Sequence, residues 1–99
     1  TSAFARAPIG SGRFRFVRTV PSQLVEFAAD TANYRGRPGV ARLLWTVRGD
    51  PGAATRALLA GEADVWEAVR PDAMAQVTAS RDVRAVPYAS LDEGLVAFN

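Results

Sequence analysis

Carboxylates are the side chains of this sequence that could take part in the most kinds of chemistry. Glu62, Asp64 and Glu67 lie in one short segment, and Asp92 and Glu93 are adjacent in another. Such groups can transfer protons or bind a hard cation, but they lack calcium-loop spacing, and acids at corners and turns are ordinarily solvated. Cysteine and histidine are both absent, which excludes thiol catalysis, Cys/His zinc sites and a Ser-His-Asp triad. We therefore expect no enzyme activity, no metal and no cofactor.

A glycine-rich stretch, Gly10-Ser11-Gly12, is similar to the loops that cradle nucleotide phosphates. A kinase loop needs a strand lysine and a His-Arg-Asp segment, and a Walker loop needs a lysine after the glycines. This chain contains neither lysine nor histidine. A dinucleotide-binding loop needs a following helix, whereas the pattern here predicts a strand. The stretch is therefore interpreted as a tight turn.

Arginine and phenylalanine alternate in the segment 13–18, which would suit a strand that stacks RNA bases. The same alternation more simply places Phe14, Phe16 and Val20 on a core face and the arginines in water. All 12 basic residues are arginine, but the net charge is only +2 and acids are interspersed. Nucleic acid is not an expected partner, and an RNA-binding β-sheet remains the weaker alternative.

The elements that would position these residues follow from hydrophobic periodicity. The expected strands are 13–20, 24–29, 41–48, 63–67, 83–89 and 94–99, with helices at 51–60 and from Pro71 onward. Leu43, Trp45 and Val47 share one face of the third strand. The fold class is α/β, a mixed β-sheet with two short helices in the order β-β-β-α-β-α-β-β. A helix between the third and fourth strands predicts a parallel crossover.

Local signals define the first of these helices. Asp50 is a suitable N-cap, Pro51 suits the first helical position, and Gly61 supplies a stop. Ala57 and Leu58 share its apolar face.

The length of 99 residues predicts one domain, 1–99. A hydrophobic share of 48% and a charged share of 22% are typical of a soluble globular chain, and no run of about 20 apolar residues is present. The chain lacks an initial methionine and closes on an apolar segment. We expect it to be a piece of a longer protein.

Four segments together resemble the extracytoplasmic solute-binding proteins of ABC transporters, the peptide- and nickel-binding type known as family 5. They are Pro8–Arg15 (PIGSGRFR), Asn33–Pro38 (NYRGRP), Asp50–Val65 (DP…ALLAGEADV) and Gly94–Asn99 (GLVAFN). Each is weak alone, but the four stand in family order and cover almost the whole chain. Arg13 replaces the family's proline, and Arg35 replaces its tryptophan.

This resemblance implies a fold and a function. The chain would be a fragment of lobe I of a two-lobe, type II periplasmic binding protein. It would bind an oligopeptide, dipeptide or similar solute by lobe closure and deliver it to the membrane permease subunits of an ABC transporter. The location would be periplasmic or extracytoplasmic, with a lipid anchor on the parent protein as one alternative. A stand-alone module that pairs with a partner through a sheet edge is the other reading of the chain.

The resemblance also implies which segments approach the solute. These are the residues after the Gly-Glu-x-Asp motif, Trp66, Glu67, Ala68 and Val69, and the loop before the last strand, Ser90, Leu91, Asp92, Glu93 and Gly94. Both segments lie at strand ends, where ligands bind in α/β folds. Glu67 or Glu93 would pair with a ligand ammonium group. The alternative, that both are solvated rim acids, stays open.

Overall fold

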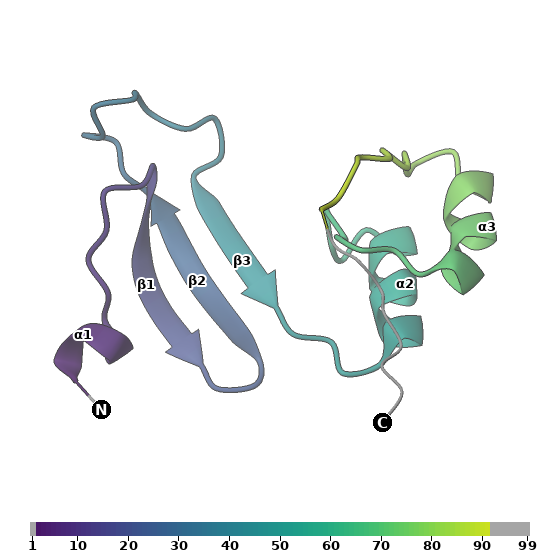
Figure 1. Cartoon of the computed structure of the whole chain (residues 1–99), viewed down its shortest axis with the longest axis horizontal. Coiled ribbons are helices and arrows are strands. Elements are labelled where there is room, and N and C mark those ends of the chain that lie inside the picture. The colour runs from purple at the N-terminus through teal and green to yellow at the C-terminus, as the bar shows by residue number, and fades with distance from the viewer. Residues whose placement is uncertain (1, 92–99) are drawn as a thin grey trace. The chain divides into compact units, whose positions relative to one another are not determined.

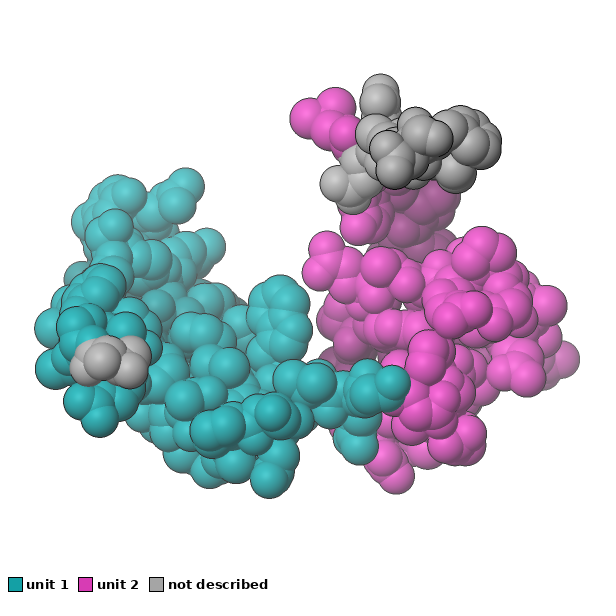
Figure 2. All heavy atoms as spheres, turned by 60° about the horizontal axis from the view of Figure 1, so that its bottom comes forward, with its two compact units in different colours: residues 1–49 teal, residues 50–99 magenta. Residues whose placement is uncertain are grey.

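The computed structural model describes residues 2–91, and the chain divides into two compact units, 1–49 and 50–99 (Figures 1 and 2). The first unit contains α1 (Ala3–Arg6), β1 (Phe14–Val20), β2 (Leu24–Ala29) and β3 (Arg42–Thr46). The second contains α2 (Pro51–Leu59) and α3 (Pro71–Ala79). The helix α1 was not expected from the sequence, because four residues are too few to show a helical period.

The three strands form one antiparallel sheet in the order β1-β2-β3, so the expected β1–β2 hairpin is confirmed (Figure 1). The pairing shifts register between Phe16 and Arg18, which makes Val17 the extra residue of a β-bulge. A bulge reverses the alternation of the residues that follow it. Val20 therefore lies on the opposite face from Phe14 and Phe16, and the prediction that all three share a face is wrong.

One face of the sheet is aromatic and aliphatic. The rings of Phe16 and Phe27 pack edge to face, with centroids 6.2 Å apart and planes at 80°. Leu43 pairs with Phe27, and Trp45 pairs with Val25, so Leu43 and Trp45 share this face as expected. Phe16 is half-buried and engaged with another ring, which does not favour its use as a platform for RNA bases.

The other face holds a buried carboxylate between two arginines. Glu26 is only 8% exposed. Its Oε2 accepts from Arg18 Nε at 2.7 Å, and its Oε1 accepts from Arg42 Nε at 2.9 Å. Hydrogen bonding from Arg18, and then from Arg42, lowers the pKa of Glu26 although burial acts in the opposite direction. This ion-paired group links all three strands.

Side-chain hydrogen bonds hold the glycine-rich turn to the loop between β2 and β3. Asn33 Nδ2 donates to the carbonyl oxygens of Ser11 at 3.1 Å and Gly12 at 2.9 Å. Arg13 Nη2 donates to the carbonyl oxygen of Arg37 at 3.0 Å. Two of the family-like segments are thus in direct contact, and a strand follows the turn as expected.

The sequence signals at the ends of α2 are confirmed. Asp50 accepts hydrogen bonds from the backbone N–H groups of Gly52 and Ala53, both at 3.0 Å, and Pro51 is the first helical residue. Gly61 follows the helix with φ of 77°, a conformation that favours glycine. These caps satisfy backbone groups that the helix itself leaves unpaired.

Asp50→Ala should lower the melting temperature by about 3–8 °C, because it removes this cap. The N–H of Gly52 is the main cause that lowers the pKa of Asp50 below 3.8. A lowered pKa means that the stabilisation is present above pH 3.8 and is lost as the pH falls through the folded value. Thermal melts followed by far-UV circular dichroism measure the effect. An equal loss in Asp64→Ala, an exposed acid that caps no helix, would contradict it.

Two predicted strands are wrong. The segments 63–67 and 83–89 contain no strand, so the described sheet has no parallel crossover and is antiparallel throughout. Alternation marks which side chains are apolar, but a strand also needs a neighbour to pair its backbone groups. In residues 50–91 both segments pass beside the helices without such a neighbour. The strand predicted for 94–99 lies outside the described residues.

Within residues 2–91 no helix has the length and the unbroken apolar character needed to cross a bilayer.

Candidate functional site

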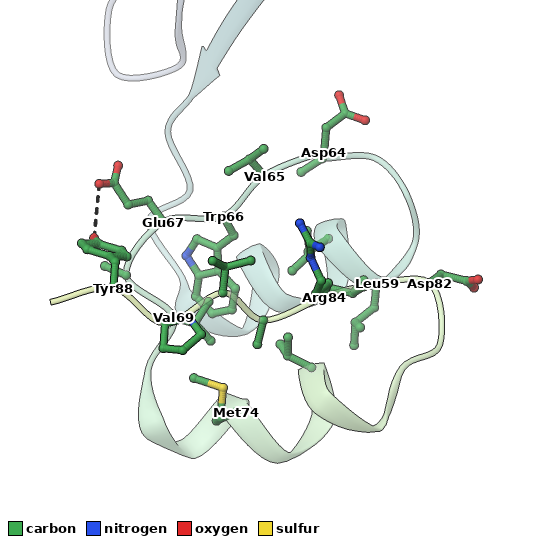
Figure 3. A pocket seen from close by; sticks show the side chains of 18 of the residues that line it. Leu59, Asp64, Val65, Trp66, Glu67, Val69, Met74, Asp82, Arg84 and Tyr88 are labelled. Atoms are coloured by element: carbon green, nitrogen blue, oxygen red, sulfur yellow. Dashed lines mark hydrogen bonds between the residues drawn. The ribbon is translucent and has the colours of Figure 1, made fainter.

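The second unit contains a hollow of about 1190 Å³ (Figure 3). Its lining comes from the end of α2, the loop 60–69, α3 and the segment 82–90. The volume exceeds the usual range for small-molecule sites, about 300–1,000 Å³, and this hollow is open to solvent. Packing of α2 on α3 holds the two helices of this lining together.

The lining is mainly apolar. Val77 of α3 is 1% exposed and Leu58 of α2 is 8% exposed, so these two side chains are the buried part of the lining. Trp66 and Val69 are half-buried, and Met74 lies below the indole in the view of Figure 3. Apolar surface that stays accessible inside a hollow favours the binding of an apolar group.

One acidic side chain at the hollow has a neutral partner. The Tyr88 hydroxyl donates to Glu67 Oε1 at 3.5 Å, which is long for an O–H···O bond and therefore weak (Figure 3). Asp64, Asp82 and Arg84 are the other ionisable residues of the lining apart from Tyr88. Among the described residues no three acids stand close enough together to hold a metal ion.

The hollow is lined by one of the two segments that the resemblance selected and by the first residue of the other. Trp66, Glu67, Ala68, Val69 and Ser90 all line it. Leu91 is fully exposed and does not. Asp92, Glu93 and Gly94 lie outside the described residues. Ligand contact by these residues remains a prediction.

The sequence analysis did not assign Met74 or Arg84 to this site. Met74 and Val77 both line the hollow from α3, and their spacing of three residues is typical of a packing face. Arg84 belongs to a segment predicted as a strand, so its position depended on a sheet that is not formed.

Residues 1–99 match the family described as bacterial extracellular solute-binding proteins, family 5 Middle. The chain belongs to this family. It is a family of solute-binding proteins rather than of enzymes, and neither a stand-alone sheet-edge module nor an RNA-binding sheet is favoured by the match. The resemblance drawn from the four sequence segments is confirmed.

Relatives of this family-5 chain include transport proteins of several bacteria. A provisionally named ABC transporter peptide-binding protein of Brucella ovis is 41% identical over 59 residues, which are 60% of this chain and 11% of that protein. The structure of the oligopeptide-binding protein AppA from Bacillus subtilis, in complex with a nonapeptide, is 34% identical with a TM-score of 0.54, over 56% of this chain and 11% of AppA.

A third likeness is to MoaA from A. tumefaciens R10 in complex with mannopinic acid. Here the identity is 27% and the TM-score 0.70, over 77% of this chain and 16% of MoaA. The α/β class and the likeness to a binding-protein lobe are thus confirmed. The family-5 chain spans less than a fifth of the length of each of these three proteins.

Proposed function

We propose that this family-5 chain is part of the first lobe of an extracytoplasmic solute-binding protein. The whole protein would bind a peptide or similar small solute by lobe closure and present it to the membrane permease of an ABC transporter. The observation that carries the proposal is the hollow, because its lining includes the segment Trp66–Val69, which the family resemblance assigned to the solute cleft, together with Ser90 of the second assigned segment.

The proposal extends to organisation and place. Residues 1–99 belong to one lobe, whose two compact units are completed by further chain in the parent protein. The family name supports a location outside the cytoplasmic membrane, in the periplasm or at the cell surface. A lipid anchor is one way in which the parent protein would be held there.

The test compares the 99-residue chain with the protein produced from its complete gene. Tight sites bury about 70–90% of a ligand's surface, and one side of a cleft cannot do so. We expect the complete protein to bind short peptides with micromolar or tighter affinity, and the 99-residue chain to bind them at least about a hundredfold more weakly. Isothermal titration calorimetry with a defined tripeptide, Ala-Ala-Ala, measures both.

The proposal would be wrong if the complete protein retained no peptide or other small solute. Native mass spectrometry of the protein isolated without denaturation provides this second readout, because a bound solute adds its own mass. Micromolar affinity of the 99-residue chain alone would contradict the part of the proposal that concerns lobe closure.

A further inference from the structure

Charge is distributed unevenly along this chain. Residues 1–49 carry eight arginines and two acids, whereas residues 50–99 carry four arginines and eight acids. The hollow lies wholly in the acidic half. Its lining has the carboxylates of Asp64, Glu67 and Asp82 against the one guanidinium of Arg84. A concave surface lined by charges of one sign concentrates ligands of the opposite sign.

Glu67 lies apart from the other charged side chains of the hollow. In the view of Figure 3, Arg84 lies on the same side of the Trp66 indole as Asp64 and Asp82, and Glu67 lies on the other side with Tyr88. Glu67 has no arginine partner among the described residues, and its one described bond comes from the neutral Tyr88 hydroxyl at 3.5 Å. By contrast, Glu26, Asp50 and Asp72 each form an ion pair with an arginine in the described chain.

An aromatic surface lies next to this carboxylate. Trp66 precedes Glu67 in the chain, is half-buried and lines the same hollow. The face of an indole attracts a cation, and it also packs against the methylene groups that carry an ammonium or guanidinium group. The apolar lining around Val69 and Met74 suits the same methylene groups.

We infer that this hollow selects peptides that present a cation on an apolar stem, with Glu67 pairing with the cation and Trp66 packing on the stem. This inference rests on the proposed function and specifies its substrate class. The cation is a lysine or arginine side chain, because only these groups carry the charge on an apolar stem of several methylene groups.

Three tripeptides test the inference on the protein produced from its complete gene. Ala-Lys-Ala carries the cation on a four-carbon stem, Ala-norleucine-Ala carries a stem of similar length without charge, and N-acetylated Ala-Lys-Ala removes the terminal ammonium group. We expect Ala-Lys-Ala to bind about tenfold more tightly than the norleucine peptide. Acetylation should change the affinity little, because the inferred cation is the lysine side chain and not the peptide terminus.

The variant Glu67→Gln should reduce the preference for charge to about twofold or less, with the norleucine peptide bound as before. Glu62→Gln is the matched control, because Glu62 is an exposed acid in the same loop that does not line the hollow. It should keep the full preference. Melting curves of the two variants should coincide with that of the unaltered protein, because both side chains are exposed.

The inference is overturned if lysine and norleucine peptides bind equally, or if Glu67→Gln keeps the preference. Either result leaves the proposed function intact, because peptides are still bound. Failure of all three tripeptides and of Ala-Ala-Ala to bind would overturn peptide binding itself, and this inference with it.

Discussion

Glu26→Gln is expected to lower the melting temperature of the chain by more than about 5 °C at neutral pH. The glutamine would leave the guanidinium groups of Arg18 and Arg42 facing one another without the carboxylate that both now contact at 2.7 Å. Glu26 is the buried member of this group, so its replacement removes the charge that neutralises two guanidinium groups held close together and leaves a buried polar side chain with weaker hydrogen bonds. Glu62→Gln, an exposed acid outside the sheet, should change the melting temperature by less than about 2 °C.

The same group gives the sheet a defined response to acid. Since the pKa of Glu26 is lowered below 4.5 in the folded chain, its contribution is fully present above pH 4.5. The contribution is lost as the pH falls through the folded pKa and the carboxylate takes up a proton. The melting temperatures of the unaltered chain and of Glu26→Gln should therefore converge in acid. A difference that stays constant from pH 7 to about pH 2 would contradict this account.

Val77→Ala should destabilise the second unit by about 1–3 kcal/mol, because the residue is only 1% exposed and its removal leaves a cavity between the helices. Few side chains in the described part of that unit, residues 50–91, are buried, so the change is not shared among many core residues. Urea denaturation followed by Trp66 fluorescence measures the effect, in a Trp45→Phe background that leaves one tryptophan.

Val65→Ala is the matched control for this substitution. It removes the same two methyl groups from a valine that is 83% exposed, and it should cost less than about 0.5 kcal/mol. Equal losses in the two variants would show that Val77 does not form the core between α2 and α3.

Local sequence signals predicted the second helix and the hairpin well. Asp50, Pro51 and Gly61 act through contacts with immediate neighbours in the chain, so their effect can be read without the tertiary fold. The reversal at Val17 could not be predicted in the same way, since a bulge depends on how the partner strand pairs. Hydrophobic alternation alone therefore placed Val20 on the wrong face.

The candidate site was predicted in part. The family resemblance selected the segment from Trp66 to Val69, which lines the hollow. Tyr88 reaches the same hollow from a segment predicted as a strand, and its contact with Glu67 joins residues 21 positions apart. Contacts of this kind depend on the path of the chain between helices, which residue spacing does not determine.

The coding DNA on both sides of this segment tests the central claim most directly. The proposed role predicts a secretory signal upstream and a few hundred further residues in frame, enough to form the opposing lobe. A start codon and a stop codon at the two ends of the 99 residues would contradict it, because a chain of this length cannot close two lobes around a solute.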